Sequence, residues 1–196
     1  MKIIKHRVNK SSELIMVPQD YGVEIDLRSE GNEIILSHDP FLPGELFEDW
    51  IKNYKHNHII LNVKEEGLEI RILNILEKNK IENFFFLDQS FPFLINLSKK
   101  LQKKTALRFS EYESFETIKL SKEKANWVWV DYFSTFPLSV DQSKLIHTLH
   151  NQKICIVSPE LQGYTDKTFL TEFANMIRTK GYLIDAVCTK FPELWV

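Results

Sequence analysis

The amino-acid sequence predicts an α/β fold of the compact (β/α)8 type, known as a TIM barrel. Short segments rich in apolar and β-branched residues alternate with segments of helical period along all 196 residues. Eight principal strands are expected, at about 24 residues for each strand–helix unit, which gives a short barrel because the fold usually takes about 250 residues. Most of these strands are continuously apolar, as in a parallel sheet that is covered on both faces.

A doubly wound open sheet is the alternative fold for this alternation. It needs a glycine loop that cradles a phosphate group, and the six glycines of the chain form neither a GxGxxG nor a GxxxxGK pattern. No internal repeat and no low-complexity segment suggests a linker. We therefore expect residues 1–196 to form a single barrel domain.

In the first half of the chain, strands are expected where apolar runs are short, and helices where apolar residues recur every three or four positions. The expected principal strands are 2–6, 22–27, 58–63 and 83–87, and a further strand at 33–37 is connected to the second of them. A helix is expected to begin near Pro43 and Gly44, because Phe47, Trp50 and Tyr54 follow at helical spacing. Two more helices are expected at 68–76 and 92–100.

The second half continues the same alternation. The expected strands are 105–109, 126–130, 153–157 and 184–188, and the expected helices are 112–120, 140–151 and 166–180. Ser139 or Asp141 is a suitable N-cap for the second of these helices. Asp166 is a suitable N-cap for the last one, and Gly181 is suited to end it.

Composition and charge exclude several classes of function. Hydrophobic residues make up 43% and charged residues 27% of the chain, and the net charge of −2 gives no overall field that favours nucleic acid or an anionic membrane. Cys155 and Cys188 lie in apolar strands and fit no zinc or disulfide pattern, so free thiols and a cytoplasmic location are expected. No apolar segment has the length of a signal peptide core or a transmembrane helix. The oligomeric state is left open.

Three groups of polar residues near the N-terminus carry the chemistry, and each lies at or just past the end of an expected strand. Glu24 and Asp26 are two positions apart on one strand, so both side chains face the same way and can hold one hard cation. Two histidines, each followed by a charged residue, can exchange protons beside this acid pair. These histidine pairs are His6-Arg7 and His38-Asp39.

The pattern His-Arg, Glu-x-Asp, His-Asp resembles the glycerophosphodiester phosphodiesterase family and the wider phosphatidylinositol-phospholipase-like barrels. The resemblance extends to Leu61-Asn62-Val63-Lys64, which falls where the family has an acidic ligand on its third strand followed two residues later by lysine. The C-terminal segment from Asp185 to Leu194 is similar to the closing strand of the family, which runs Asp-Gly-hydrophobic-hydrophobic-Thr-Asp-x-Pro-x-Leu. Together these motifs imply that the resemblance covers the whole chain.

The resemblance implies a phosphodiesterase with a role for each matching residue. His6 and His38 would be the general acid and base. Glu24, Asp26 and the third-strand position, here Asn62, would bind Mg²⁺ or Ca²⁺, which would neutralise the charge of the phosphodiester. The basic residues Arg7 and Lys64 would contact the phosphate of a small-molecule, lipid or glycan phosphodiester.

Three features depart from the family pattern. Asn62 is neutral where the family has a carboxylate, and Val8 replaces the glycine that usually follows His-Arg. Only about 20 residues separate His38 from the next principal strand, so the insertion that caps the substrate in the family is missing. An open site favours a large head group, a lipid-linked phosphate or a glycan phosphate. The alternative function is a catalytically weak or inactive barrel that binds a phosphorylated ligand.

Several other charged residues have structural interpretations. Glu24 and Asp26 can form ion pairs with Arg7 and Arg28 instead of a cation site. Arg108 lies within an apolar strand, so an acid partner such as Asp88 is expected for it. The remaining candidates are Asp131 as a structural partner, Glu160 as either a residue of the site mouth or a surface acid, and Trp127 and Trp129 as filling for the barrel interior.

Overall fold

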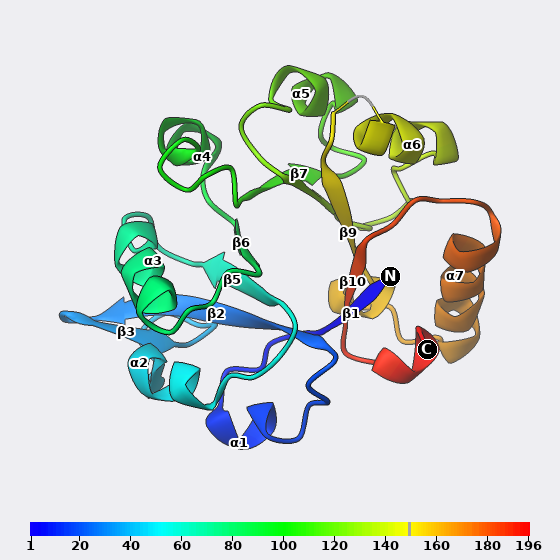
Figure 1. Ribbon diagram of the computed structural model, residues 1–196. Coiled ribbons are helices and arrows are strands. Elements are labelled where there is room, and N and C mark those ends of the chain that lie inside the picture. Colours follow the sequence, from blue (N-terminus) through cyan, green and yellow to red (C-terminus); the bar gives the residue numbers. More distant parts are fainter. Residues whose placement is uncertain (149) are drawn as a thin grey trace. The chain divides into compact units, whose positions relative to one another are not determined.

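The computed structural model describes residues 1–148 and 150–196, and its described part contains ten strands and seven α-helices in the expected alternation (Figure 1). The chain divides into two compact units. We call Lys5–Thr105 the N-terminal unit and Met1–Ile4 together with Ala106–Val196 the C-terminal unit. None of the described helices is long and apolar enough to cross a membrane.

The N-terminal unit contains five strands, three of them parallel. The strands are β2 (Gly22–Glu30), β3 (Glu33–Leu36), β4 (Glu45–Leu46), β5 (Ile59–Val63) and β6 (Phe84–Leu87). β5 pairs in parallel with β2 on one side and with β6 on the other, whereas β3 is antiparallel to both β2 and β4. The parallel register places Asp26 opposite Asn62, so two candidate site residues are neighbours across the β2–β5 pair.

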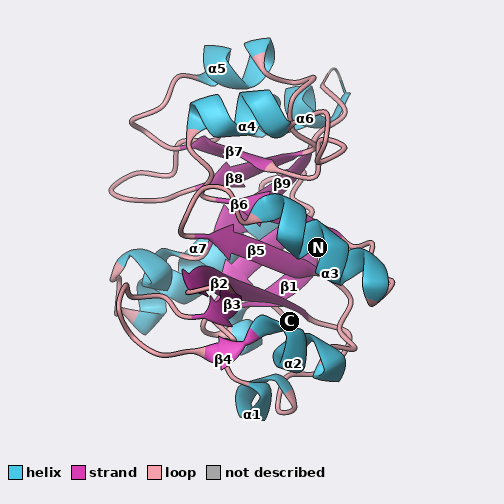
Figure 2. Ribbon diagram, turned by 90° about the vertical axis from the view of Figure 1, so that its left-hand side faces the viewer, coloured by secondary structure: helices cyan, strands magenta, loops and turns pink. Residues whose placement is uncertain are grey.

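Four α-helices and one short 3-10 helix accompany these strands (Figure 2). They are α1 (Ser11–Leu14), α2 (Phe47–Trp50), η1 (Ile51–Asn53), α3 (Glu69–Lys78) and α4 (Phe91–Leu97). Side chains of α2 and α3, among them Trp50 and Ile72, are buried in one cluster with Ile25, Leu27 and Leu61 of the strands. This shared apolar core fixes the strands whose ends carry the candidate site.

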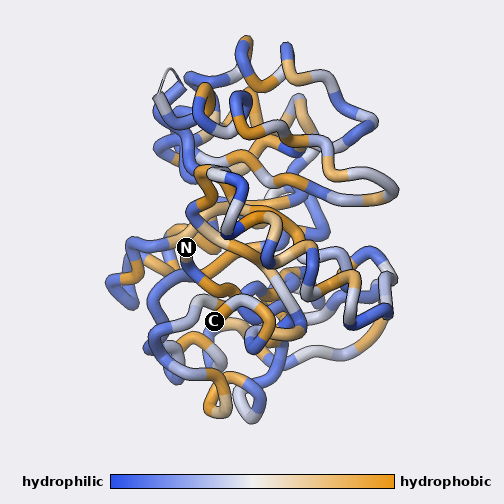
Figure 3. The backbone as a smooth tube through the Cα atoms, turned by 90° about the vertical axis from the view of Figure 1, so that its right-hand side faces the viewer, coloured by the Kyte–Doolittle hydropathy of each residue, from blue (hydrophilic) through white to orange (hydrophobic). Residues whose placement is uncertain are grey.

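The C-terminal unit contains a parallel sheet in the order β10–β9–β8–β7. Its strands are β7 (Ala106–Phe109), β8 (Trp127–Val130), β9 (Lys153–Val157) and β10 (Ala186–Thr189). β1 (Lys2–Lys5) begins in this unit, where the N–H of Lys2 donates to the carbonyl of Asp185 at 2.6 Å. Hydrophobic stretches, orange in Figure 3, alternate with hydrophilic stretches, in blue, along the chain.

The helices of the C-terminal unit are α5 (Phe115–Leu120), α6 (Val140–Thr148) and α7 (Lys167–Thr179), with short 3-10 helices η2 (Pro159–Gln162) and η3 (Pro192–Leu194). The predicted caps are confirmed for α7, because Asp166 accepts from the N–H groups of Thr168 and Phe169 and Gly181 has a φ of +79°. For α6, Ser139 is the cap, since its hydroxyl accepts from the N–H of Gln142. Position 149, within the helix predicted at 140–151, lies outside the described residues.

Several helix boundaries differ from the sequence prediction, among them the start of α5 at Phe115, and two of the differences have a clear physical reason. The helix expected from Pro43 begins only at Phe47, because residues 45–46 are extended and pair with β3. The helix expected at 92–100 ends at Leu97, and Gln102 and Lys103 adopt positive φ angles of 51° and 60° that no continuing helix allows. Lys99, Lys100 and Lys103 therefore lie in turns that follow this helix.

Gly44 makes a close backbone contact that shapes the loop after β3. A Cβ atom at this position would overlap the carbonyl oxygen of Leu36 and lie 2.8 Å from its carbonyl carbon. Only glycine fits such an approach without displacing the backbone. The contact brings the far end of the loop back against the last residue of β3, two positions before His38.

We predict that Gly44→Ala lowers the free energy of unfolding by about 1–3 kcal/mol, because the added methyl group must push the loop away from Leu36. Chemical denaturation monitored by circular dichroism measures the change. Gly31→Asn is the control, since Gly31 has a φ of +59° that asparagine tolerates and nothing lies within 4 Å of its Cβ position. Equal stability of Gly44→Ala and the wild type would contradict the account of this loop.

Candidate active site

The candidate site is built on a pair of buried carboxylates on β2. Glu24 and Asp26 are each only 1% exposed, and they project from the same face of the strand, as their spacing of two predicts. Two buried carboxylates repel each other and lose their hydration, so they require hydrogen-bond donors and positive charge nearby. The residues that meet this requirement define the rest of the site.

Two segments of the N-terminal unit, residues 6–7 and β5, place polar groups at Glu24. Its Oε2 accepts from the backbone N–H of Arg7 at 2.7 Å and lies 3.8 Å from Nε2 of His6. Its Oε1 accepts from Nδ2 of Asn62 at 3.0 Å. Burial, and then the neighbouring charge of Asp26, raise the pKa of Glu24 well above its ordinary value, although the donors from Asn62 and Arg7 and the charge of Lys64 oppose this.

Asp26 is surrounded more completely than Glu24. Nζ of Lys64 lies 3.2 Å from Oδ1, and Nε of Arg7 lies 3.6 Å from Oδ2. Asn9 forms two hydrogen bonds with this residue: its Nδ2 donates to Oδ2 and its Oδ1 accepts from the backbone N–H of Asp26, both at 2.9 Å. The sequence reasoning missed Asn9, since no spacing relates a loop residue to a strand residue 17 positions later.

Arg7 and Lys64 occupy the positions where the sequence predicts phosphate contacts. Arg7 has a φ of 54°, a left-handed conformation that lets its backbone N–H reach Glu24 while its guanidinium group reaches Asp26. Lys64 joins Asp26 to Asp88, whose Oδ2 lies 3.4 Å from Nζ. Both cations therefore lie at the acid pair, and the guanidinium group remains partly exposed.

His38 is connected to the acid pair through the backbone. The N–H of Ser37 donates to the carbonyl of Asp26 at 3.1 Å. This hydrogen bond holds the residue before His38 against β2, the strand that carries the acid pair. Nδ1 of His38 lies 2.7 Å from Oδ1 of Asp39, and the resulting hydrogen bond lowers the pKa of Asp39. The guanidinium group of Arg28 donates to the carbonyl of His38 at 3.2 and 3.0 Å, and this fixes the backbone that carries the imidazole.

The carboxylates of Glu24 and Asp26 suit a hard divalent cation, but a third ligand must come from the side-chain amide of Asn62. Among the residues the structure describes, no three histidine, cysteine, aspartate or glutamate side chains lie together as a metal site. A cation at the Glu24–Asp26 pair would therefore depend on Asn62 as its third ligand. Oδ1 of Asn62 is buried and accepts no hydrogen bond from any described residue, so it is an oxygen that a cation would satisfy.

The structural interpretation of the acid pair is correct for one of its two arginines. Arg7 lies beside Asp26, whereas Arg28 lies 3.5 Å from Glu65. Glu65 also accepts from the N–H and the hydroxyl of Ser29. Glu65 therefore contacts Arg28 and Ser29 and does not join Lys64 at the acid pair. This agrees with an extended segment, in which neighbouring side chains point to opposite sides.

The charged residues predicted in the second half form two clusters within the C-terminal unit. Arg108 pairs with Asp131 (Nη2–Oδ2 2.8 Å), so the partner shown for this arginine is Asp131, where the sequence prediction favoured Asp88. Asp131 also accepts from the indole N–H of Trp129, and both it and Trp129 are buried. Asp131 is thus the structural partner that the sequence predicts.

Glu160 belongs to neither of the two environments expected for it. It is buried, accepts from the hydroxyl of Thr189 at 2.6 Å and from the N–H of Lys190 at 2.9 Å, and bonds the hydroxyl of Ser158. The indole N–H of Trp195 donates to the same serine at 3.2 Å. Glu160 therefore connects the end of β9 to the segment that follows β10.

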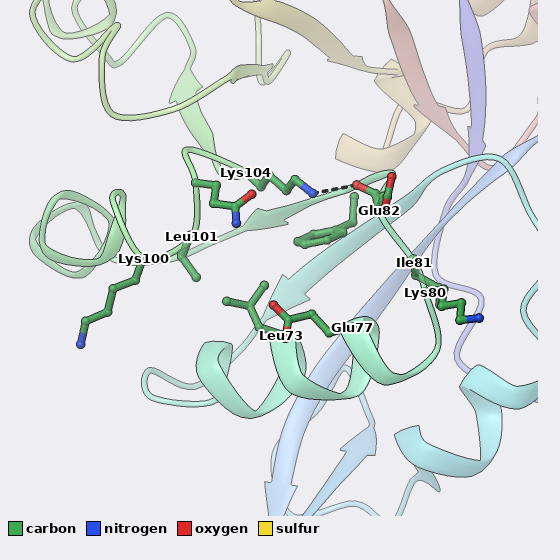
Figure 4. Close-up of a pocket in the computed structure, with 10 residues that line it drawn as sticks. Leu73, Glu77, Lys80, Ile81, Glu82, Lys100, Leu101 and Lys104 are labelled. Carbon is green, nitrogen blue, oxygen red and sulfur yellow. Dashed lines mark hydrogen bonds between the residues drawn. The ribbon is translucent and has the colours of Figure 1, made fainter.

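A small cavity of about 200 Å³ adjoins Lys64 and Asp88, and Glu65, Glu66, Glu69 and Ser90 also line it. A larger cavity of about 560 Å³ is walled by Leu73, Ile81 and Leu101 with several lysines and glutamates (Figure 4). There Nζ of Lys104 donates to the backbone carbonyl of Glu82 at 3.0 Å. The larger cavity contains none of the predicted site residues, whereas the smaller one is bordered by Lys64.

Comparison with known proteins identifies the fold. No family model matches the chain, and no curated protein sequence matches it. A glycerophosphodiester phosphodiesterase from Agrobacterium tumefaciens has a similar structure, with a TM-score of 0.70 over 99% of this chain and 98% of that chain at 10% identity. A glycerophosphoryl diester phosphodiesterase from Parabacteroides distasonis gives a TM-score of 0.66 over 99% and 84% at 14% identity.

These similarities confirm the predicted α/β fold class and agree with the family resemblance that the motifs indicated. At such low identity the comparison establishes the fold.

We predict that Asn9→Ala destabilises the protein by about 1–3 kcal/mol, because it leaves the backbone N–H of Asp26 without its acceptor and removes a donor from a buried carboxylate. Thermal unfolding gives the comparison. Asn53→Ala is the matched control, since Asn53 makes only a long, exposed hydrogen bond of 3.4 Å to Ser11. Equal effects of the two substitutions would show that Asn9 does not hold the acid pair.

Proposed function

We propose that the protein is a phosphoric diester hydrolase that uses two histidines in acid–base catalysis. The observation that carries the proposal is the buried Glu24–Asp26 pair with His6, Arg7 and Lys64 gathered around it. Burial of this many charges is costly and gives the fold nothing that apolar residues would not give, so a binding or catalytic role accounts for it better. The shared fold with glycerophosphodiester phosphodiesterases supports the same conclusion.

The two histidines have surroundings suited to proton transfer. Nε2 of His6 lies 3.8 Å from the Oε2 atom of Glu24, so the imidazole faces the acid pair. His38 has the equivalent carboxylate partner in Asp39. One histidine activates the nucleophile and the other protonates the leaving oxygen; the nucleophile is either water or a hydroxyl of the substrate, and the latter would yield a cyclic phosphate.

Arg7 and Lys64 would bind the phosphate group. Each carries a positive charge close to Asp26, and a guanidinium group suits the paired oxygens of a phosphodiester. When a phosphodiester binds here, Arg7 and Lys64 would give up part of their contact with Asp26 and bind the phosphate oxygens instead. The small cavity beside Lys64 would receive the group next to the phosphate.

We further propose that Glu24, Asp26 and Asn62 hold Mg²⁺ or Ca²⁺. When bound, such an ion would offset the negative charge that builds up on the phosphate oxygens. The buried Oδ1 of Asn62 supports this assignment, because it accepts no hydrogen bond from a described residue and is a suitable ligand for a hard cation. Burial and the charge of Asp26 raise the pKa of Glu24, and a bound cation would act in the opposite direction. Arg7 and Lys64 already offset Asp26, so the ion would be held more weakly than by three carboxylates.

The substrate we propose is a phosphodiester with a glycerol-like, lipid-linked or glycan head group. The short segment between His38 and β5 leaves no room for a capping insertion, and this supports a large substrate. A single functional domain over residues 1–196 and a cytoplasmic location stay predictions, the latter supported by the small number of cysteines, Cys155 and Cys188, both of which are buried. The second candidate is a barrel that only binds a phosphorylated ligand, which the neutral Asn62 favours.

We predict that His6→Asn and His38→Asn each reduce hydrolysis of bis(p-nitrophenyl) phosphate by about 10²–10⁴-fold, because asparagine transfers no proton. Release of p-nitrophenol is followed with Mg²⁺, with Ca²⁺ and with EDTA. His56→Asn is the control, since His56 contacts only the carbonyl of Val17 and Tyr54 of the same unit.

Loss of turnover in both variants, with thermal unfolding unchanged, is the expected result. If the protein binds a phosphate ester in the presence of EDTA but hydrolyses none, the hydrolase proposal fails. The second candidate, a barrel that only binds a phosphorylated ligand, then takes its place.

We predict that Asn62→Asp strengthens cation binding while it destabilises the cation-free protein. The new carboxylate would lie about 3 Å from Glu24, so without an ion the two charges repel and unfolding becomes easier by about 1–3 kcal/mol. Millimolar Ca²⁺ or Mg²⁺ should then raise the melting temperature more for the variant than for the wild type. Asn53→Asp is the exposed control, and equal responses of all three proteins to the ions would remove the cation from the proposal.

A further inference from the structure

The ammonium group of Lys64 lies between two carboxylates of the N-terminal unit. Its Nζ is 3.2 Å from Oδ1 of Asp26 and 3.4 Å from Oδ2 of Asp88. Asp26 belongs to β2, whereas Asp88 directly follows β6 and has no part in the function proposed above. Since β2 and β6 flank β5 on its two sides, Lys64, which follows β5, contacts an acid from each neighbouring strand.

The backbone at Asp88 has a conformation that few residues with a side chain adopt. Its φ of 65° lies in the left-handed region, which aspartate tolerates better than most residues. Conformations of this kind are concentrated at functional sites, where the surrounding structure stabilises them. The turn leads from β6 to Ser90, the N-cap of α4. The end of β6 therefore carries a conformational cost that its surroundings must offset.

The residue after Asp88 is anchored to the loop that follows Lys64. Nε2 of Gln89 donates to Oε1 of Glu69 at 3.0 Å, and Oε2 of Glu69 accepts from the backbone N–H of Gly67 at 3.0 Å. Glu69 is only 1% exposed, so both bonds are shielded from water. They connect the segment after β6 to the segment after β5, and this holds Asp88 at a fixed place relative to Lys64.

A carboxylate at this place needs a reason, because it repels the anion that the site is proposed to bind. The small cavity of about 200 Å³ is bordered by both Lys64 and Asp88, so the ion pair adjoins the space beside the acid pair. With Asp26 as its sole partner, the ammonium group would be drawn fully to that carboxylate. Asp88 attracts the ammonium group from another strand and so weakens the competition of Asp26 with a phosphate for Lys64.

We propose that Asp88 is a positioning residue, which holds the ammonium group of Lys64 where the phosphate of a phosphodiester binds. The inference rests on the proposed function and adds a residue to it. When phosphate oxygens replace part of the contact with Asp26, the contact with Asp88 persists and restrains a flexible side chain in the orientation that binding needs. The alternative is an ion pair that only stabilises the fold.

The first test is Asp88→Asn, which removes the charge, keeps the shape and tolerates the positive φ. The KM for bis(p-nitrophenyl) phosphate and the Kd for dimethyl phosphate, from a phosphorus NMR titration, should each rise about tenfold, while kcat changes less than about threefold. Asp49→Asn is the control, since it removes the acid partner of Lys52 on an exposed surface of the same unit. Unchanged or tighter binding by Asp88→Asn would overturn the proposal, because the loss of a repelling charge alone has that effect.

The second test is a double-mutant cycle with Lys64→Met. Because Asp88 acts through Lys64 in the proposal, Asp88→Asn should cause no further loss of affinity for dimethyl phosphate once Lys64 is replaced. The same loss in both backgrounds would show that Asp88 only supports the fold, and would overturn the proposal. Thermal unfolding checks each variant. If Lys64→Met does not fold, the direction of the change in Asp88→Asn decides the proposal.

Failure of the proposed function gives a different result. A wild type that binds dimethyl phosphate but hydrolyses no phosphodiester would remove the hydrolase, and a weaker Kd in Asp88→Asn would still support the role of Asp88. A wild type that hydrolyses phosphodiesters, with Asp88→Asn equal to it in KM and Kd, would keep the hydrolase and overturn the role of Asp88. A wild type with neither binding nor turnover would overturn both proposals.

Discussion

The arrangement of the N-terminal unit depends on the burial of two carboxylates side by side on β2. Glu24 and Asp26 are removed from water, and each must find donors or cations within the protein. The backbone of Arg7, the amides of Asn9 and Asn62, and the ammonium group of Lys64 all converge on them. Because these partners come from two segments distant in sequence, residues 7–9 and 62–64, the acid pair also determines how those segments lie against β2.

This requirement explains how the chain departs from the family pattern at Val8. Val8 is buried in the apolar core, and its N–H donates to the carbonyl of Glu24 at 2.8 Å. The left-handed backbone conformation falls one residue earlier, at Arg7, so position 8 does not need a glycine. The sequence change therefore preserves the path of the loop that delivers His6 and Arg7 to the acid pair.

The sequence predicted the parts of the structure that follow from local periodicity. Strand alternation correctly placed Glu24 and Asp26 on one face, and helix capping chemistry correctly predicted both ends of α7. It did not predict Asn9, whose role depends on a contact between a loop and a strand. Nor did it predict the short strand β4, because the pairing of residues 45–46 with β3 depends on Gly44 reaching Leu36. Contacts of this kind are tertiary and leave no repeating pattern in the chain.

The same limit applies to partners of charged residues. An arginine in an apolar strand predicts an acid partner, but which acid is settled only when the strands are placed in register. Arg108 is in register with Trp129 across β7 and β8, so Asp131 lies two residues beyond the residue directly opposite this arginine. Sequence spacing alone gives no preference for this acid over another at a strand end.

The most direct test of the central claim is a crystal structure with a non-hydrolysable phosphonate diester. The account predicts that the phosphonate oxygens lie within hydrogen-bond distance of Arg7 and Lys64, with His6 and His38 on either side of the phosphorus. The cavity near Lys104 offers an alternative anion site, since Lys80 and Lys100 also line it. A phosphonate bound in that cavity, with the Glu24–Asp26 site left to solvent, would contradict the assignment of the active site.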